Sequence, residues 1–486
     1  MKRAGVVLGM GAAVYLAAVV ACSSPYAGGA DSSGYLNFAR LLLAGEWTEP
    51  GRPIAGLAAP EWTFWRQQPL GFEADRATGE LTPTYPVGLP LHLAAAGSLV
   101  GLERASIVVN VFLVIASGML MVGTARRLEL SNGWAMLCAG LLWASPIYFL
   151  NTLQPMSDLA ATVWVLAAIY FALRARGDYR AGLAAGAAVA MAVLVRPANA
   201  IVMLPIAVVL GARIRAWAAL MVGGLPGGIF WGWVNATLYG GVLRTGYGDV
   251  SWYFGWRFAG PNALHFAKWL PVLLSPPVVL AALGLPWVPS APAPIRLLLA
   301  TWFGAFAGFY VFYSFSGMEW WYMRFLLPAF PAVILAGALV ARVLLAKIES
   351  GRTRGAVGAA LLAVMTIWNV RVGDAHNVSH IARSDEAYKL TADWLQEELP
   401  GNAIVLVSQL SGAMTYYTDF ALIRWDTIED EATWAKVRGA AAAAKRPLYA
   451  ALYDFEIERA FTSEYVPGKW ERVAQIRQMS VWRLHD

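Results

Sequence analysis

Two ionisable side chains lie where the chain leaves long apolar runs, and both could take part in chemistry. Asp31 is the first acidic residue of the sequence and follows a mostly apolar run through the stretch PYAGGA. Its carboxylate could face a cavity at the mouth of a membrane domain, or it could be an ordinary solvated loop residue. Arg324 lies in the string GMEWWYMRFLLPAF, at the edge of another apolar run. Its fork of donors suits a pair of phosphate oxygens, although an ion pair with Glu319 would also explain it.

Three further polar residues stand at the ends of apolar runs. Ser157 and Asp158 begin one run, where Ser157 fits a helix N-cap and Asp158 a favourable charge near a helix N-terminus. Arg196 lies in LVRPAN, with almost no loop around it. An arginine at membrane depth is costly and is by default a functional candidate, although its long side chain can also reach outward to the interface. Both interpretations stay open.

The composition is that of a membrane protein. Of the 486 residues, 58% are hydrophobic and 14% are charged, whereas a soluble protein has about 25% charged residues. Residues 372–486 hold 12 basic and 17 acidic residues, and residues 1–371 hold 25 basic and 14 acidic residues. We therefore predict a transmembrane domain over 1–371 and an aqueous domain over 372–486. The net charge of +6 does not indicate nucleic-acid binding, because the basic residues lie in loops between apolar runs.

Apolar runs of about 20 residues can cross the roughly 30 Å of hydrocarbon as helices. We predict about eleven spans, several of them short or interrupted by Pro or Gly. They lie at about 4–22, 104–125, 132–150, 157–173, 181–195, 198–212, 216–238, 269–287, 297–315, 325–346 and 355–371. Lys2 and Arg3 with VVAC at 19–22 resemble a secretory or lipoprotein signal, but the ten later runs favour a retained first helix.

Lys and Arg cluster in alternate short loops, which predicts a cytoplasmic N-terminus. The first loop (23–103), the loop 239–268, the turn around Glu319 and the C-terminal domain then lie on the outer face. Within the first loop, 33–45 and 82–101 are predicted as interfacial helices, although 82–101 could also be a tilted or re-entrant span. We infer an integral membrane protein, most consistent with a bacterial inner membrane.

The C-terminal domain alternates strand and helix patterns. Apolar strands at 403–409, 421–425 and 447–453 are separated by helical segments, and 470–484 forms a final strand or hairpin. Such alternation predicts a small α/β layer structure. The region has no glycine-rich phosphate loop, so nothing in it indicates nucleotide binding.

Several features together resemble the GT-C superfamily of membrane glycosyltransferases, which includes protein O-mannosyltransferases and the aminoarabinose transferases of lipid A modification. These features are the carboxylate just after the first span, the interfacial helices of the first outer loop, the segment YPVGLPL, the string RFLLP and the outer C-terminal domain. The resemblance covers most of 1–371 in layout, and only short motifs in identity. It implies transfer of a sugar from a polyprenyl-phosphate carrier to a glycan, lipid or protein acceptor, with inversion at the sugar carbon.

The resemblance also implies roles for single residues. Asp31 corresponds to the catalytic base, and Arg324 to a basic residue that holds the carrier phosphate. Many relatives have an adjacent acidic pair where this chain has Asp31-Ser32, and some have a basic residue near the first-loop prolines, where this chain reads PTYPVG. The remaining phosphate contacts are therefore predicted for one or more of three basic residues: Arg196, Arg257 and Lys268. The residues predicted to line the substrate site are Tyr35, Tyr85, Asp158, Glu319, Trp320 and Tyr322.

The sequence says less about a metal ion and about the role of the aromatic segments. Asp31 and Asp158 could together hold a divalent metal, but their spacing has no metal-binding signature, and no cofactor is predicted. The aromatic residues near Glu319 also fit a belt at the lipid interface regardless of function. The loop 239–268 is rich in Gly, aromatic residues and Arg. It is predicted either to cover the substrate or to plug the membrane surface.

Three rival functions remain. A transporter would bury ionisable residues in mid-span and repeat its halves, whereas here the charges gather at span ends and no repeat is visible. A polysaccharide polymerase or ligase would normally place its site in large mid-chain outer loops. A sensor would use the C-terminal domain to bind a ligand. The enzyme hypothesis requires Asp31 and Arg324 to share one outward-facing chamber.

Overall fold

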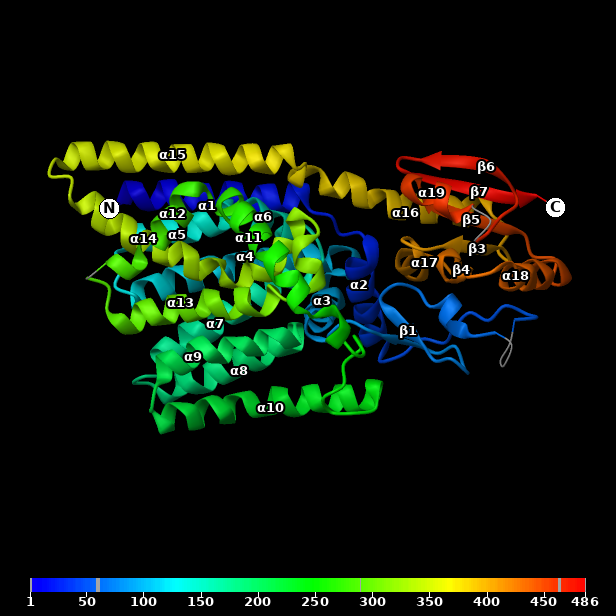
Figure 1. Cartoon of the computed structure of the whole chain (residues 1–486), viewed down its shortest axis with the longest axis horizontal. Helices are drawn as coiled ribbons and strands as arrows, with labels where there is room; N and C mark the ends of the chain where they lie inside the picture. The colour runs from blue at the N-terminus through cyan, green and yellow to red at the C-terminus, as the bar shows by residue number, and fades with distance from the viewer. Residues whose placement is uncertain (1, 58–61, 289, 462–464, 486) are drawn as a thin grey trace. The chain divides into compact units, whose positions relative to one another are not determined.

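The computed structural model describes residues 2–57, 62–288, 290–461 and 465–485 (Figure 1). The chain is mainly helical and carries a small sheet region near its C-terminus. The predicted architecture of apolar helices followed by an α/β region is therefore confirmed.

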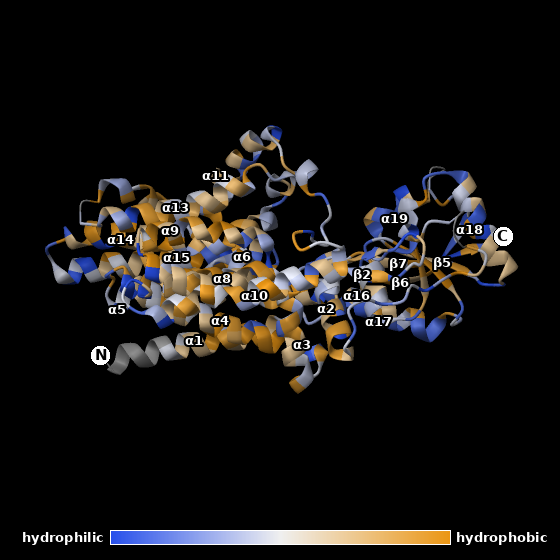
Figure 2. Cartoon of the chain, turned by 90° about the horizontal axis from the view of Figure 1, so that it is seen from below, coloured by the Kyte–Doolittle hydropathy of each residue, from blue (hydrophilic) through white to orange (hydrophobic). Residues whose placement is uncertain are grey.

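Apolar helices make up most of the membrane part, as the hydrophobic colours of Figure 2 show. They are α1 (Lys2–Cys22), α4 (Leu102–Arg127), α7 (Ser157–Arg174), α8 (Tyr179–Val195), α9 (Met203–Leu210), α10 (Ile214–Tyr239), α13 (Ala293–Tyr310), α14 (Phe330–Ala346) and α15 (Gly351–Ala375). Among the described residues, six helices are long and apolar enough to cross a membrane, or up to eight if two bent pairs each count as one span. The predicted count of eleven is not confirmed.

Two of the predicted spans are each broken into two helices. The run 132–150 forms α5 (Asn132–Ala144) and α6 (Pro146–Leu153), which meet at 65°. The run 269–287 includes the end of α11 (Ala259–Leu274), then a 119° bend, then α12 (Pro276–Leu283). A proline begins the second helix of each pair, and proline cannot donate a backbone hydrogen bond to the preceding turn.

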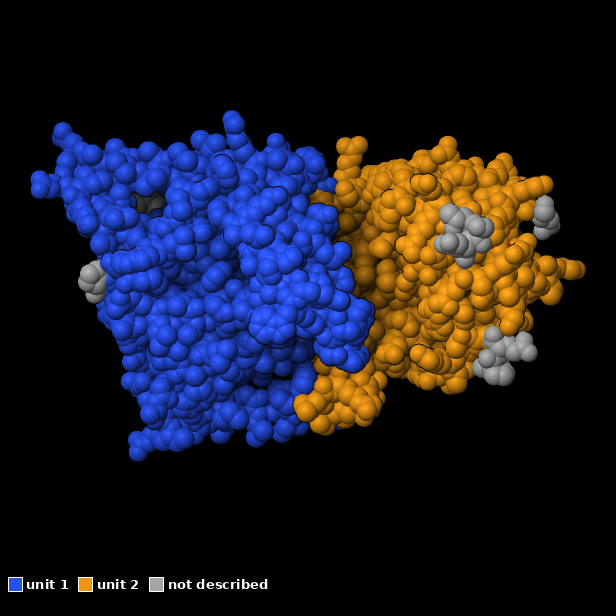
Figure 3. Space-filling view, viewed as in Figure 1, with its two compact units in different colours: residues 1–23, 108–234, 248–380 blue, residues 24–107, 235–247, 381–486 orange. Residues whose placement is uncertain are grey.

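The chain divides into two compact units (Figure 3). The first unit contains residues 1–23, 108–234 and 248–380, and the second contains 24–107, 235–247 and 381–486. The second unit thus combines residues 24–107 and 235–247 with the C-terminal α/β region.

In the second unit, residues 24–107 form helices at both places where the sequence predicts interfacial ones. They are α2 (Gly29–Ala44) and α3 (Gly88–Val100), with a short hairpin of β1 (Phe72–Ala74) and β2 (Leu81–Pro83) between them. Gly45 ends α2 in the left-handed conformation, with φ of 78°, and its N–H donates to the carbonyls of Leu41 and Leu42. A glycine suits this C-terminal position because it has no Cβ to strain.

The C-terminal sheet has five strands in the order β4-β3-β5-β7-β6. β3 (Ile404–Val407) pairs in parallel with β4 (Ala421–Arg424) and with β5 (Leu448–Tyr453), while β7 (Met479–His485) pairs antiparallel with β5 and with β6 (Lys469–Ile476). The helices of this region are α16 (Ile381–Glu398), α17 (Ser411–Tyr417), α18 (Glu431–Ala443) and α19 (Asp454–Ala460).

Apolar cores cover both faces of this sheet. Alternate residues of β3 enter different clusters, with Ile404 and Leu406 in one and Val405 and Val407 in the other, as the period of a strand requires. The first of these clusters also contains three buried residues of the segment between α2 and α3: Ile54, Leu57 and Trp62. Burying such side chains contributes about 1.5–3 kcal/mol each, so the first loop is part of the core of the C-terminal region.

Candidate active site

Asp31 lies in the first turn of α2. Gly28 precedes the helix in an extended conformation, and Gly29 begins it with φ of 57°. A carboxylate in the first turn is stabilised by the helix dipole. The Tyr85 hydroxyl, which comes from the segment just before α3, donates a hydrogen bond to Asp31 Oδ1 over 2.5 Å.

Two further tyrosine rings lie beside the ring of Tyr85. The rings of Tyr35 and Tyr85 have centroids 4.8 Å apart, and Tyr247 lies edge-on to Tyr85 at 6.1 Å. A Cβ at Gly34 would lie 2.4 Å from the Tyr85 ring, so only glycine allows this ring to lie against α2. The structure therefore places Asp31, Tyr35 and Tyr85 together. Tyr247 was not singled out from the sequence, although it lies in the loop predicted to face the substrate.

The Tyr85 phenol remains a hydrogen-bond donor because its pKa is raised. Burial raises the pKa of Tyr85 well above its ordinary value, and the Asp31 carboxylate raises it further, because a second negative charge beside the first is unfavourable. The phenol therefore stays protonated at neutral pH and keeps donating to Asp31.

A second polar cluster lies in the other unit, around Asp158. Its side chain is 1% exposed, and Oδ1 lies 2.8 Å from Arg196 Nη2 while Oδ2 lies 3.9 Å from Arg324 Nη1. Asp158 comes from the first turn of α7, Arg196 from the end of α8, and Arg324 from the 3-10 helix η7 (Trp320–Ala329) that leads into α14. Three residues that the sequence suggested separately thus form one charged group.

The role predicted for Ser157 as an N-cap is wrong. Met156 occupies the cap position and Ser157 is the first residue of α7. The Ser157 hydroxyl instead accepts a hydrogen bond from Arg196 Nη2 over 3.0 Å, so it helps to hold that guanidinium.

Aromatic rings complete the Asp158 cluster. The guanidinium carbons of Arg196 and Arg324 lie 5.6 and 5.4 Å from the centre of the Phe325 ring, and Arg324 also lies 5.6 Å from the Tyr322 ring. Cations at this distance are attracted to the ring face. Since two guanidinium groups surround one carboxylate, the three charged side chains carry a net positive charge. Such a cluster can attract an anion.

The other predicted site residues of this unit lie against different partners. Trp320 packs on His376, with ring centroids 4.5 Å apart. Arg257 and Lys268 are exposed and rest on Phe258 and Trp269, at 4.7 and 4.9 Å. Glu319 is exposed at the start of η7. Within the described part of the chain, no group of three or more His, Cys, Asp or Glu side chains could hold a metal ion.

Known structures share this fold. No protein-family model matches the chain, and no curated protein sequence does so. ArnT from Cupriavidus metallidurans bound to undecaprenyl phosphate superposes with a TM-score of 0.65 at 13% identity, over 99% of this chain and 98% of that chain. The apo state of the same protein gives a TM-score of 0.57 at 15% identity, over 99% and 98% of the two chains.

A larger enzyme also matches. The arabinofuranosyltransferase AftD from mycobacteria, in its R1389S mutant, gives a TM-score of 0.53 at 13% identity, over 100% of this chain and 42% of that chain. The chain therefore shares the fold of ArnT and AftD, as the resemblance stated from its sequence predicted.

Proposed function

We propose that this protein is a glycosyltransferase that moves a sugar from a polyprenyl-phosphate carrier to an acceptor on the outer face of the membrane. The observation that carries the proposal is the likeness, over 99% of the chain, to a structure that binds undecaprenyl phosphate. The proposal includes about eleven spans, a cytoplasmic N-terminus in a bacterial inner membrane, a catalytic transmembrane domain over 1–371 and an outer domain over 372–486. The acceptor is a glycan, a lipid or a protein.

Asp31 is the proposed general base. As the acceptor oxygen attacks the anomeric carbon, the Asp31 carboxylate takes the acceptor proton. The hydrogen bond from Tyr85 orients this carboxylate. The rings of Tyr35 and Tyr85 offer flat faces on which the sugar can stack.

The arginine cluster is the proposed site of the leaving group. The bond between the anomeric carbon and the phosphate oxygen breaks, its electron pair passes to the phosphate, and polyprenyl phosphate departs. Direct displacement inverts the sugar carbon. Arg324 and Arg196 stabilise the charge that develops on the phosphate, and Asp158 holds the two guanidinium groups in place. This mechanism requires Asp31 and Arg324 to face a common outer chamber.

The test is release of polyprenyl phosphate by the purified protein from polyprenyl-phosphate sugars. Asp31→Asn should abolish release while the protein stays folded, and Glu46→Gln, which changes an exposed carboxylate of the same loop, should release at the wild-type rate. Full turnover by Asp31→Asn would remove the proposed base. Movement of the lipid-linked sugar across vesicles without any transfer would support a transporter instead.

A further inference from the structure

Helix α2, which carries Asp31, lies in very close contact with α17 of the C-terminal region. A Cβ at Gly412 would lie 2.2 Å from Ser33 Oγ, so no larger residue fits there without a shift. The fully buried Asn37 donates from Nδ2 to the Gly412 carbonyl over 2.9 Å. This contact fixes both the distance and the register between the two helices.

The segment that enters α2 is held by the same region. The buried Ser24 hydroxyl donates to Asp385 Oδ2 over 2.7 Å, and the Ala27 N–H donates to the Tyr417 hydroxyl over 2.9 Å. A Cβ at Gly28 would lie 3.0 Å from Asp385 Cγ. The few residues before Asp31 are therefore bound to α16 and α17 by both hydrogen bonds and close packing.

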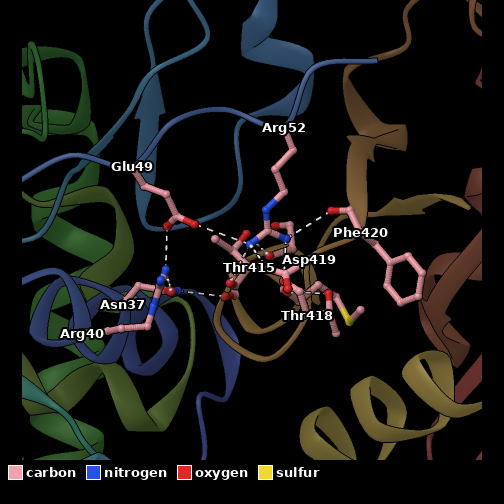
Figure 4. Close-up of polar contacts among 11 residues, drawn as sticks. Asn37, Arg40, Glu49, Arg52, Thr415, Thr418, Asp419 and Phe420 are labelled. Carbon is pink, nitrogen blue, oxygen red and sulfur yellow. Dashed lines mark hydrogen bonds and ion pairs between the residues drawn. The ribbon is translucent and has the colours of Figure 1, made fainter. Parts of the chain in front are cut away.

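Arg52 fastens the segment that follows α2 (Figure 4). Its Nη1 donates to the carbonyls of Thr418 and Phe420 over 2.6 and 3.1 Å, and its Nη2 donates to the Thr415 carbonyl over 3.1 Å. Carbonyls in the last turn of a helix lack partners within the helix, and a positive charge is favourable there. Arg52 therefore caps the C-terminal end of α17 from the first outer loop.

A chain of polar contacts leads from Arg52 back to α2. Glu49 accepts from Arg52 at 3.5 Å and from Arg40 at 2.6 Å, and Arg40 also donates to Asn37 Oδ1 over 3.3 Å (Figure 4). Because Asn37 bonds Gly412 as well, the contacts run from the end of α17 through the loop to α2 and back to α17.

From these contacts we infer that the C-terminal α/β region positions the helix that carries Asp31, with Arg52 and Asn37 as positioning residues; this rests on the proposed role of Asp31 as the base. Catalytic groups must be held within a fraction of an ångström of their productive geometry, and a small displacement can cost about 100-fold in rate. Helix α2 is fastened before Asp31, at Asn37 and, through Arg52, in the loop beyond the helix.

The test compares Arg52→Met and Arg52→Lys with the control Arg76→Met, which removes an exposed arginine of the same loop. Turnover and hydrogen exchange of residues 29–44 are measured on the full chain in detergent. Arg52→Met should lower kcat on the order of 10- to 100-fold, with KM for the lipid-linked sugar changed less than twofold and with faster exchange in α2. The kcat of Arg52→Lys should lie between those of the wild type and Arg52→Met, because lysine keeps the charge without the fork of donors. Arg76→Met should match the wild type.

Two results would overturn the inference. One is faster exchange in α2 with unchanged kcat, and the other is a loss of activity that only follows the loss of folded protein. Asn37→Leu provides a second variant, in which α2 loses its own bond to Gly412 and the same changes are expected. If Asp31→Asn keeps full turnover, the proposed function fails. The exchange measurement would still report whether Arg52 holds α2.

Discussion

The Tyr85 hydroxyl lies 2.5 Å from Asp31 Oδ1 and donates its proton to that carboxylate. The two residues are 54 positions apart in the sequence, and the bare backbone of Gly34 allows the Tyr85 ring to reach α2. A hydrogen bond to a carboxylate favours its charged form, which is the form that a general base requires.

Tyr85→Phe should lower kcat roughly 10-fold, since hydrogen bonds to charged groups are worth about 1.5–3 kcal/mol. The acid limb of the pH–rate profile should move to higher pH, because the carboxylate loses a bond that favours its charged form. The wild type should show no loss near pH 10 from this phenol, because burial first and Asp31 second raise the pKa of Tyr85 above its ordinary value of 10.0. Turnover across the pH range is the measurement, with the exposed Tyr179→Phe as control. An unshifted acid limb in Tyr85→Phe would contradict this role.

Replacing Arg324 tests which cation holds the phosphate. Arg324→Met should lower kcat/KM for the lipid-linked sugar at least 100-fold, and Arg324→Lys about 10-fold, because lysine keeps the charge but loses the fork. Arg257→Met should change it less than twofold, since Arg257 is exposed and rests on Phe258. If Arg257→Met instead lowers kcat/KM more than Arg324→Met does, the phosphate binds at the loop 239–268.

A cross-linking experiment tests whether Asp31 and Arg324 face one chamber. With Cys22 replaced by Ser, the pair Asp31→Cys and Arg324→Cys should be joined by a short bifunctional thiol reagent, as seen by mass spectrometry of the digested protein. The control pairs Asp31→Cys with Arg342→Cys. Arg342 lies near the far end of α14 and should not cross-link. If the control pair cross-links efficiently, or if the test pair does not cross-link, Asp31 and Arg324 do not face one chamber.

The buried Glu456 should make the stability of the C-terminal region depend on pH. Burial raises the pKa of Glu456 above its ordinary value of 4.5. The folded protein therefore keeps this proton to higher pH than the unfolded chain, and stability should fall as pH rises from 4.5 through the raised pKa. Glu456→Gln cannot ionise and should lose this dependence.

The measurement is the apparent Tm against pH. Glu456→Gln should also be less stable by about 1–3 kcal/mol, because its amide has one acceptor oxygen where the carboxylate accepts from the Gln409 and Tyr453 N–H groups and from Trp425. Glu458→Gln changes an exposed residue of the same helix and should keep the wild-type profile. Parallel profiles for wild type and Glu456→Gln would refute the assignment.

The long apolar runs predicted the positions of several helices closely. The run 104–125 became α4 (Leu102–Arg127) and the run 216–238 became α10 (Ile214–Tyr239), because a long apolar run has few other stable conformations in lipid. The bends at Pro146 and Pro276 were not predicted. A proline in an apolar run can begin a new helix or only kink an existing one, and packing against neighbouring helices decides between these outcomes.

The sequence indicated which residues have suitable chemistry, but it did not indicate which of them lie in contact. Asp158, Arg196 and Arg324 were each notable for their chemistry, but only the fold brings α7, α8 and η7 together. Arg52 gave no sequence signal, because its main partners are backbone carbonyls, which every residue carries. The sequence also did not predict that Ile54 packs in the C-terminal core, because a single apolar residue in a loop is common.

The shared core of the first loop and the C-terminal sheet also sets an order of events during synthesis. Ile54, Leu57 and Trp62 leave the ribosome long before Trp434 and Leu452, which belong to the same core. Until these later residues have been made, the early segment lacks its partners in this core. A polypeptide that terminates before β7 cannot complete the five-stranded sheet, so the Asp31 region can mature only after the C-terminal sheet has been made.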